Sequence, residues 1–309
     1  MIFFKPNFWD KNKNSFFSIL LFPISLLIKL FSFFDRKLTK TYKCSIPTIC
    51  VGNIYLGGTG KTPLSVEIFL ILKSLNMRPA FIRKKYNNFQ DEVNLQEQIG
   101  PVYQNKKRIK AIREAIQNKA DIAILDDGFQ DFSMTKSLSI ICFNEKQWIG
   151  NGLLIPSGPL RESLTALKRA QCVFINGEKN TYIENYILSK NKEIKIFYSK
   201  YKPQNIDKFK NKKAIAFAGI GNPDNFFDLL KNNNIKIYKK IKFPDHYNYS
   251  VKEIKSLINL AKEKNTVLIT TEKDYFRISE DQKPKINYLK IKIEIENKNK
   301  FIDEIKKII

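Results

Sequence analysis

The chain has 309 residues, of which 43% are hydrophobic and 13% aromatic, so it contains enough apolar material for a packed core. This composition excludes a disordered basic tail protein. Its 54 Lys and Arg residues outnumber 30 Asp and Glu residues, and the formal net charge of +24 points to an anionic partner: a nucleic acid, a membrane with anionic lipid, or a phosphorylated substrate.

Cysteine and histidine usage limits the metal chemistry. The four cysteines include no C-x-x-C pair, and a single histidine cannot form a His-rich cluster, so a zinc site is not expected. A catalytic metal should therefore be a hard ion bound by oxygen, such as Mg²⁺. The unpatterned thiols indicate a reducing compartment, in or facing the cytoplasm.

The first predicted element is an apolar segment over residues 16–34, nearly long enough to cross a bilayer. Pro23 and Lys29 argue against an ordinary spanning helix. Ser18, Ser25, Lys29 and Ser32 fall on one helical stripe, which favours a helix or broken helical pair in the membrane interface. Anionic headgroups would meet the basic residues that follow, Arg36, Lys37, Lys40 and Lys43. A helix packed on the protein's own core is the alternative.

A phosphate-binding loop is predicted next. Residues 48–51 form a short apolar run, followed by GNIYLGGTGKTP and a helical pattern. Glycines let the backbone approach phosphate, Lys61 can reach the β- and γ-phosphates, and the Thr62 hydroxyl can bind Mg²⁺ at a helix N-terminus. Tyr55 replaces a glycine of the strict pattern, so this is a variant P-loop. Its nucleotide-binding residues are predicted to be Tyr55, Leu56, Gly57, Gly58, Thr59, Gly60, Lys61 and Thr62.

An apolar strand over residues 121–127 ends in two carboxylates, Asp126 and Asp127. It resembles a Walker B strand, whose terminal carboxylate holds Mg²⁺ directly or through water. Adjacent strand residues point in opposite directions, so the two should not share one role unless the strand has already ended. The alternative is a pair that caps the turn at Gly128.

Strand and helix patterns alternate along the rest of the chain. Strands are predicted at 48–51, 79–82, 122–125 and 139–143, and again at 172–175, 195–198, 214–218, 235–241 and 267–269, with helices between them. This predicts an α/β fold: a P-loop NTPase-like lobe with a mostly parallel sheet, a second smaller α/β lobe, and the N-terminal apolar helix. We expect the membrane-associated segment at 1–43, the nucleotide-binding lobe at 44–150 and the second lobe at 151–309. A last helix near 300–309 could pack back on either lobe.

Four blocks in order carry a family resemblance: VGNIYLGGTGKTP, ILDDGFQ, IPSGPLRE, and AGIGNP with FPDHYNY and LITTEKD. Together they resemble tetraacyldisaccharide 4'-kinase, the lipid A 4'-kinase of Gram-negative bacteria, over nearly the whole chain. The resemblance implies transfer of the ATP γ-phosphate, with Mg²⁺, to the 4'-hydroxyl of tetraacyldisaccharide 1-phosphate. The product would be lipid IVA, formed at the cytoplasmic face of the inner membrane by a peripheral or monotopic enzyme.

The resemblance also implies roles for individual residues. The family's G-D-E motif corresponds to Gln90, Asp91 and Glu92 here, which gives Asp91 the role of catalytic base, and the histidine of the F-P-D-H motif, which supports that base, matches His246. Lys61 completes the catalytic set.

The IPSGPLRE block contains two further candidates. Arg161 and Glu162 lie in a region that lines the family's active-site cleft; the guanidinium of Arg161 suits phosphate, and Glu162 either supports the metal or arginine or forms a surface ion pair.

The chain departs from the family pattern at two places. Arg83-Lys84-Lys85-Tyr86 replaces R-G-Y-G, and Asp131 replaces a histidine. Both changes put local loop geometry in question near the expected substrate or nucleotide side.

A second function class fits part of the sequence. A membrane-associated P-loop ATPase acting as a switch or partition protein has a similar glycine loop but does not need Asp91 and His246. Nucleic-acid binding is not expected, because the lysines are dispersed and no recognised motif is present. No obligate protein partner is inferred.

Overall fold

The computed structural model describes residues 5–10, 15–86 and 90–309, which form two compact units. The large unit comprises residues 5–10, 15–85, 100–200 and 294–309, and the small unit comprises residues 86, 90–99 and 201–293. Each unit has its own sheet, and the α/β fold expected from the alternating pattern is confirmed.

The eight-stranded sheet of the large unit has the order β12-β7-β6-β5-β1-β4-β2-β3, and the seven strands from β7 to β3 pair in parallel. The strands are β1 (Thr48–Gly52), β2 (Pro79–Lys84), β3 (Val102–Asn105), β4 (Ile122–Asp126), β5 (Leu138–Asn144), β6 (Cys172–Asn176), β7 (Lys195–Pro203) and β12 (Ile291–Ile295). Every residue of β1, β4, β5 and β6 is buried, as expected for central parallel strands with both faces covered.

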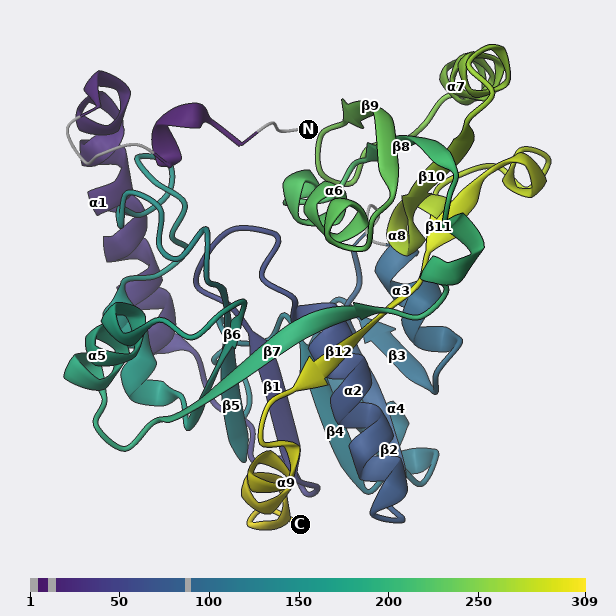
Figure 1. Ribbon diagram of the computed structural model, residues 1–309. Helices are drawn as coiled ribbons and strands as arrows, with labels where there is room; N and C mark the ends of the chain where they lie inside the picture. The colour runs from purple at the N-terminus through teal and green to yellow at the C-terminus, as the bar shows by residue number, and fades with distance from the viewer. Residues whose placement is uncertain (1–4, 11–14, 87–89) are drawn as a thin grey trace. The chain divides into compact units, whose positions relative to one another are not determined.

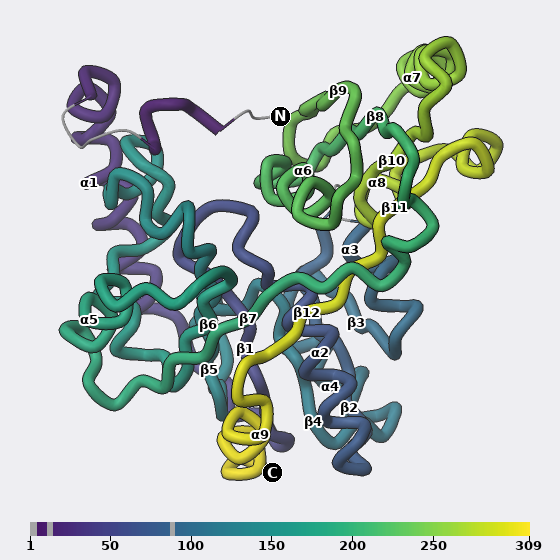
Figure 2. The backbone as a smooth tube through the Cα atoms, in the orientation of Figure 1, coloured from purple at the N-terminus to yellow at the C-terminus, as the bar shows by residue number. Residues whose placement is uncertain are grey.

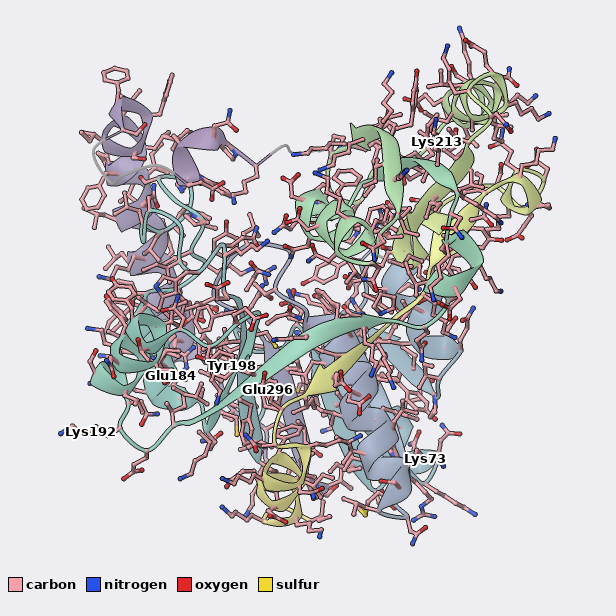
Figure 3. All side chains as sticks on the ribbon, viewed as in Figure 1. Lys73, Glu184, Lys192, Tyr198, Lys213 and Glu296 are labelled. Atoms are coloured by element: carbon pink, nitrogen blue, oxygen red, sulfur yellow. The ribbon has the colours of Figure 1, made fainter. Side chains whose placement is uncertain are left out.

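Helices and short 3₁₀ turns complete the large unit: η1 (Asn7–Trp9), α1 (Phe16–Leu38), α2 (Lys61–Ser74), α4 (Arg108–Gln117), η2 (Leu164–Arg169), α5 (Thr181–Lys190) and α9 (Lys298–Lys306). The strands β7 and β12 lie side by side (Figure 2), and the backbone N–H of Glu296 donates to the carbonyl of Tyr198 over 2.9 Å. The Tyr198 hydroxyl donates to Glu184 of α5 (2.8 Å); all three residues are labelled in Figure 3. After β12 the chain enters α9, whose Phe301 packs on Phe174 and Phe197, so the last helix packs on this sheet.

Helix α1 presents its apolar side chains outward. It is continuous through Pro23, is long and apolar enough to cross a membrane, and buries only Ser18 and Ser25. Figure 1 shows it beside the loop that follows β5. There the Ser25 hydroxyl donates to the carbonyl of Leu154 (2.9 Å), and Asn151 Nδ2 donates to Ser18 Oγ (3.2 Å).

The segment is a single helix, one of the two expected forms, but its orientation differs from the expectation. Two members of the polar stripe, Ser18 and Ser25, face the protein rather than headgroups, because their hydroxyls satisfy polar groups of a buried loop. The alternative of an apolar face covering the core is also wrong: the large apolar side chains of α1 are mostly exposed.

The small unit is built on a four-stranded parallel sheet of order β11-β10-β8-β9. Its elements are α3 (Gln90–Glu97), η3 (Ile206–Phe209), β8 (Lys213–Ala218), α6 (Pro223–Asn232), β9 (Lys236–Lys242), α7 (Val251–Glu263), β10 (Val267–Thr271), α8 (Glu272–Phe276), η4 (Lys283–Lys285) and β11 (Asn287–Leu289). Two apolar clusters fill it, one around Phe227 and Ala216 and the other around Ile258 and Phe217.

The units do not follow the expected division into 1–43, 44–150 and 151–309. Strands β6, β7 and β12 pair in the large sheet, α1 belongs to the large unit, and residues 90–99 belong to the small unit although they lie between β2 and β3 in sequence. The Gly- and Pro-rich stretch at 150–158 is an internal loop of the large unit, because Asn151 and Ser157 form hydrogen bonds there with α1.

Candidate functional site

A glycine loop joins β1 to α2 in the large unit. Gly57, Gly58 and Gly60 have φ values of +83°, +58° and +89°, a region that residues with a Cβ rarely adopt, and α2 begins directly at Lys61. The side chain of Asn53 closes the loop from within, donating to the carbonyl of Tyr55 (2.5 Å) and to Thr59 Oγ1 (3.0 Å). The result is a strand, a left-handed glycine turn and a helix N-terminus, the arrangement that binds phosphate.

Two cations converge on Asp127 beside this loop. Lys61 Nζ lies 3.6 Å from Asp127 Oδ1, and Arg161 Nη1 donates to Oδ1 and Oδ2 over 2.9 and 3.0 Å. The three side chains remain partly exposed. Residues far apart in the sequence thus form one polar cluster at the start of α2.

Backbone pairing explains why Arg161 lies here. The N–H of Leu56 donates to the carbonyl of Pro159 (2.9 Å), and the N–H of Arg161 donates to the carbonyl of Ile54 (2.7 Å). The segment before Arg161 therefore pairs with the glycine loop itself. This places the predicted substrate residue Arg161 next to the predicted nucleotide residues.

Asp126 and Asp127 have different surroundings. Strand β4 ends at Asp126, which is buried and accepts a hydrogen bond from Arg83 Nη1. Asp127 follows the strand with φ +52°, and its carboxylate faces Lys61. The two carboxylates therefore have different partners, but strand alternation is not the reason, because the strand ends before Asp127.

An arginine that the sequence did not single out holds this strand end. Arg108 at the start of α4 donates from Nη2 to the carbonyls of Asp126 (3.2 Å) and Asp127 (2.8 Å), and from Nη1 to Asp131 Oδ2 (3.0 Å). Burial raises the pKa of Asp131, but hydrogen bonds from Ser133 and the charge of Arg108 outweigh it and hold the pKa below its usual value. The residue that departs from the family pattern is therefore built into the site's support.

Glu162 pairs with a different arginine from the one that contacts Asp127. It forms an ion pair with Arg169 at 2.7 Å, with both side chains largely shielded from solvent. The guanidinium of Arg169 also lies over the rings of Phe129 (4.7 Å) and Phe132 (5.0 Å). The ion-pair interpretation of Glu162 thus fits better than a metal contact, although the pair is more buried than a surface pair.

The donors near the loop suit a hard cation bound together with phosphate. No group of three or more His, Cys, Asp or Glu side chains that could hold a metal alone occurs among the described residues. The Thr62 hydroxyl and the carboxylates of Asp126 and Asp127 are oxygen donors, and Mg²⁺ typically takes one or two such ligands plus phosphate oxygens and water. These residues fit Mg²⁺ bound with a nucleotide.

The small unit holds a separate cluster around Asp91, in the first turn of α3. Asp91 is 3% exposed, and its Oδ1 lies 3.5 Å from His246 Nδ1. His246 follows β9 with φ +55°, and its backbone N–H donates to the carbonyl of Gly219 (3.1 Å). The two residues matched through the resemblance are thus neighbours in space, 155 positions apart in the sequence.

Residues 270–277 supply the rest of this cluster. Arg277 donates from Nη2 to Asp91 Oδ2 (2.5 Å) and from Nη1 to Asp274 Oδ1 (3.0 Å). Lys273 of α8 pairs with Glu92 at 2.5 Å, so both acidic residues of the Asp91-Glu92 pair face a cation.

Charge pairing sets the ionisation of this cluster. Burial raises the pKa of Asp91, but the contact with His246 and the charges of Arg277 and Lys273 outweigh it and lower the pKa to about 2. Burial likewise raises the pKa of Asp274, and there it outweighs Arg277 and the hydrogen bonds to the carboxylate. Asp91 is therefore held ionised at neutral pH.

The structure thus assembles the predicted residues in two sets: Lys61, Asp127 and Arg161 in the large unit, and Asp91 with His246 in the small unit. Sequence reasoning missed Arg83, Arg108 and Arg277. Two of them left a signal in the sequence: Arg83 matches the arginine of the family's R-G-Y-G turn, and Arg277 lies three residues after Asp274 in a helical pattern, where side chains meet.

Comparisons with known proteins agree over almost the whole chain. The family described as tetraacyldisaccharide-1-P 4'-kinase matches residues 17–99 and 88–309. A protein named tetraacyldisaccharide 4'-kinase from Pelagibacter ubique is 44% identical over 307 residues, 98% of each chain. One of the same name from Rickettsia akari is 34% identical, over 94% of this chain and 93% of its own.

A solved structure has the same overall fold. The LpxK protein from Aquifex aeolicus, crystallised in complex with ATP, is 26% identical and superposes with a TM-score of 0.72. The match covers 94% of this chain and 99% of that one.

Proposed function

Because the chain belongs to the tetraacyldisaccharide 4'-kinase family, we propose that the two clusters divide the work of one phosphoryl transfer. The reaction moves the γ-phosphate of ATP to the 4'-hydroxyl of tetraacyldisaccharide 1-phosphate and forms lipid IVA. Two observations support this division: the large unit contains a glycine loop with two cations beside it, and the small unit contains a buried, ionised carboxylate.

The large unit is proposed to bind the nucleotide. Backbone N–H groups of residues 57–62 bind the phosphates, and the side chains of Lys61 and Arg161 balance the phosphate charge. On nucleotide binding, the γ-phosphate replaces Asp127 as the anion that these two cations contact. Mg²⁺, held by Thr62 and by Asp126 or Asp127, supplies further charge neutralisation when bound. Asp127 would thus balance the two cations before the nucleotide binds and, like Asp126, offer a carboxylate oxygen to Mg²⁺ afterwards.

The small unit is proposed to accept the proton of the attacking sugar hydroxyl. For transfer to occur, Asp91 must accept the proton of the same sugar hydroxyl that attacks the γ-phosphate, and His246, 3.5 Å from Asp91 Oδ1, supports that carboxylate. A carboxylate with a pKa near 2 is a weak base. This suits a loose transition state, in which the proton leaves late and orientation of the hydroxyl contributes most.

The alternative of a switch or partition ATPase explains less of the molecule. It gives no role to the cluster of Asp91, His246 and Arg277, and the relatives carry the name of the kinase.

We also propose that α1 holds the protein on the cytoplasmic face of the inner membrane as a monotopic anchor. Support comes from the exposed apolar side chains of α1, from its polar attachment to the protein through Ser18 and Ser25, and from the basic residues that follow. From Met1 to Lys43 the sequence has eight Lys and Arg and two Asp and Glu, so part of the net charge lies where anionic lipid would meet it.

The direct test incubates the purified full chain with MgATP and tetraacyldisaccharide 1-phosphate in detergent micelles. Mass spectrometry should detect a product heavier by one phosphoryl group, with ADP formed in equal amount. ATP hydrolysis without that product would favour the ATPase alternative, and neither product with an active control enzyme on the same lipid would contradict the proposed function.

A further inference from the structure

Arg277 lies at the centre of the small-unit cluster and has no role in the function described so far. It caps the C-terminal end of α8, and only 7% of its side chain is exposed. Its guanidinium donates to Asp91, to Asp274 and to the carbonyl of Gly219 (2.7 Å). A buried arginine with three anionic or carbonyl partners is held in one orientation.

The two oxygens of Asp91 differ because of this contact. Oδ2 accepts from Arg277 Nη2 at 2.5 Å, whereas Oδ1 is buried and accepts no hydrogen bond from the described residues. Oδ1 is also the oxygen that lies 3.5 Å from His246 Nδ1. Arg277 therefore occupies one oxygen of the carboxylate, and the other oxygen faces His246.

Arg277 and His246 both donate a hydrogen bond to the backbone carbonyl of Gly219. Its carbonyl accepts from Arg277 Nη1 (2.7 Å) and from the backbone N–H of His246 (3.1 Å). Arg277 Nη2 also lies 3.4 Å from His246 Nδ1. One backbone group thus sets the positions of both neighbours of Asp91.

Asp274 is itself held rigidly, which fixes the other end of Arg277. Its Oδ1 accepts from the Tyr249 hydroxyl (2.8 Å) and the Gly219 N–H (3.0 Å), and its Oδ2 accepts from the Thr271 hydroxyl (2.6 Å). A Cβ at Gly219 would lie 2.8 Å from the Tyr249 oxygen, so only glycine leaves space for this packing. The network has the features of a support for a functional carboxylate.

We propose that Arg277 is the positioning residue of the phosphoryl transfer, holding Asp91 by Oδ2 so that Oδ1 receives the proton of the attacking sugar hydroxyl. In that step the sugar O–H bond breaks and its proton goes to Oδ1 of Asp91. The sugar oxygen forms a bond to the γ-phosphorus, and the bond between the γ-phosphorus and the oxygen that bridges it to the β-phosphate breaks, which releases ADP. The inference rests on the proposed role of Asp91 and adds the group that orients it.

The charges around Asp91 predict how this role depends on pH. Arg277 and Lys273 face it from α8, His246 with Asp245 from the loop after β9, and Glu92 from α3. Loss of the Arg277 charge raises the pKa of Asp91, since burial then acts against fewer positive groups. Protonation of Asp91 would then stop turnover at a pH where the wild type is still active.

The test compares the pH dependence of kcat for the wild type, Arg277→Gln and Arg277→Lys. Arg277→Gln should lower the plateau kcat by roughly 10²-fold and move the acid limb to higher pH by about one unit or more. Arg277→Lys keeps the positive charge but loses the two-pronged set of N–H donors that contacts Asp91 and Asp274. The acid limb of its pH profile should therefore stay closer to that of the wild type, while its kcat falls. KM for ATP should change little in either variant.

The matched control is Tyr249→Phe, which removes a hydrogen bond from the same network and no charge near Asp91. Its acid limb should coincide with that of the wild type; an equal shift in Tyr249→Phe would show general loosening and overturn the proposal. If Arg277→Gln fails to fold by circular dichroism, Arg277→Lys decides alone: a wild-type kcat in that variant would overturn the proposal.

A double-variant cycle separates this inference from the assignment of Asp91. If Asp91→Asn retains wild-type turnover, the base assignment is wrong. If Asp91→Asn is inactive but Arg277→Gln resembles the wild type, only the role of Arg277 is wrong. When both are right, adding Arg277→Gln to Asp91→Asn lowers the residual rate no further, because the arginine acts through the carboxylate.

Discussion

Arg161 donates from a single nitrogen, Nη1, to both carboxylate oxygens of Asp127, over 2.9 and 3.0 Å. Lys61 approaches the same carboxylate at 3.6 Å. Two cations gathered around one anion leave an excess of positive charge beside the glycine loop. The contacts with Asp127 therefore hold both side chains beside the glycine loop.

Replacing Lys61 with Met should abolish most turnover without unfolding the protein. The side chain is partly exposed and pairs with Asp127 only at 3.6 Å, so its loss costs little stability. In the proposed reaction, however, its charge stabilises the γ-phosphate in the transition state. We expect kcat to fall by roughly 10²- to 10³-fold. The matched control is Lys73→Met in the last turn of the same helix, which should retain activity; equal losses in both variants would contradict the assignment.

Asp126→Asn and Asp127→Asn should differ in kind. Asp126 is buried opposite a buried Arg83, and removing one charge of such a pair costs about 3–5 kcal/mol of unfolding free energy. Asp127→Asn removes a partly exposed charge and should lose activity with a smaller loss of stability. Urea unfolding and kcat on both variants check this. Equal destabilisation by the two changes would argue against the different surroundings of the two carboxylates.

The glycine loop could be read from the sequence because all its parts are local. Strand, glycines, Lys61 and helix follow one another without interruption, and α2 begins at Lys61 as the motif requires. Local order in the sequence was sufficient for this loop. The different partners of Asp126 and Asp127 do not follow from the alternation of side chains along a strand, because β4 ends at Asp126 and Asp127 follows it with φ +52°.

Other features depend on contacts that no local pattern encodes. The assignment of residues 90–99 to the small unit comes from the packing of α3 on α8, and the place of β12 in the large sheet comes from its pairing with β7. Arg108 lies in an ordinary amphipathic helix, so nothing nearby in the sequence shows that it bonds to the carbonyl of Asp127. The orientation of α1 was missed because periodicity locates a polar stripe without saying what it faces.

Lowering the pH should remove the contribution of the ionised Asp91 side chain to the free energy of unfolding. Its folded pKa of about 2 lies below its ordinary value of 3.8, so the ionised group stabilises the folded state above that ordinary value, and the contribution is lost as pH falls toward 2. The difference in unfolding free energy between wild type and Asp91→Asn should narrow by about 2 kcal/mol from pH 5 to pH 2. Urea unfolding of both proteins at several pH values measures this difference. If the difference in unfolding free energy does not change with pH, the pKa of Asp91 is not depressed in the folded state.

Glutamate substitutions on the exposed side of α1 should weaken the binding of the protein to membranes. Leu20 and Leu27 are 60% and 56% exposed and lie opposite Ser18 and Ser25 on the helix, so changing both to Glu leaves the polar attachment intact. Burying a leucine in an apolar environment is worth about 1.5–3 kcal/mol, so partitioning to anionic vesicles should weaken at least tenfold. The control is Leu70→Glu with Leu188→Glu, which adds the same charges at exposed leucines outside α1 and should leave binding nearly unchanged. Vesicle co-sedimentation measures both, and equal binding by the two double variants would contradict α1 as the anchor.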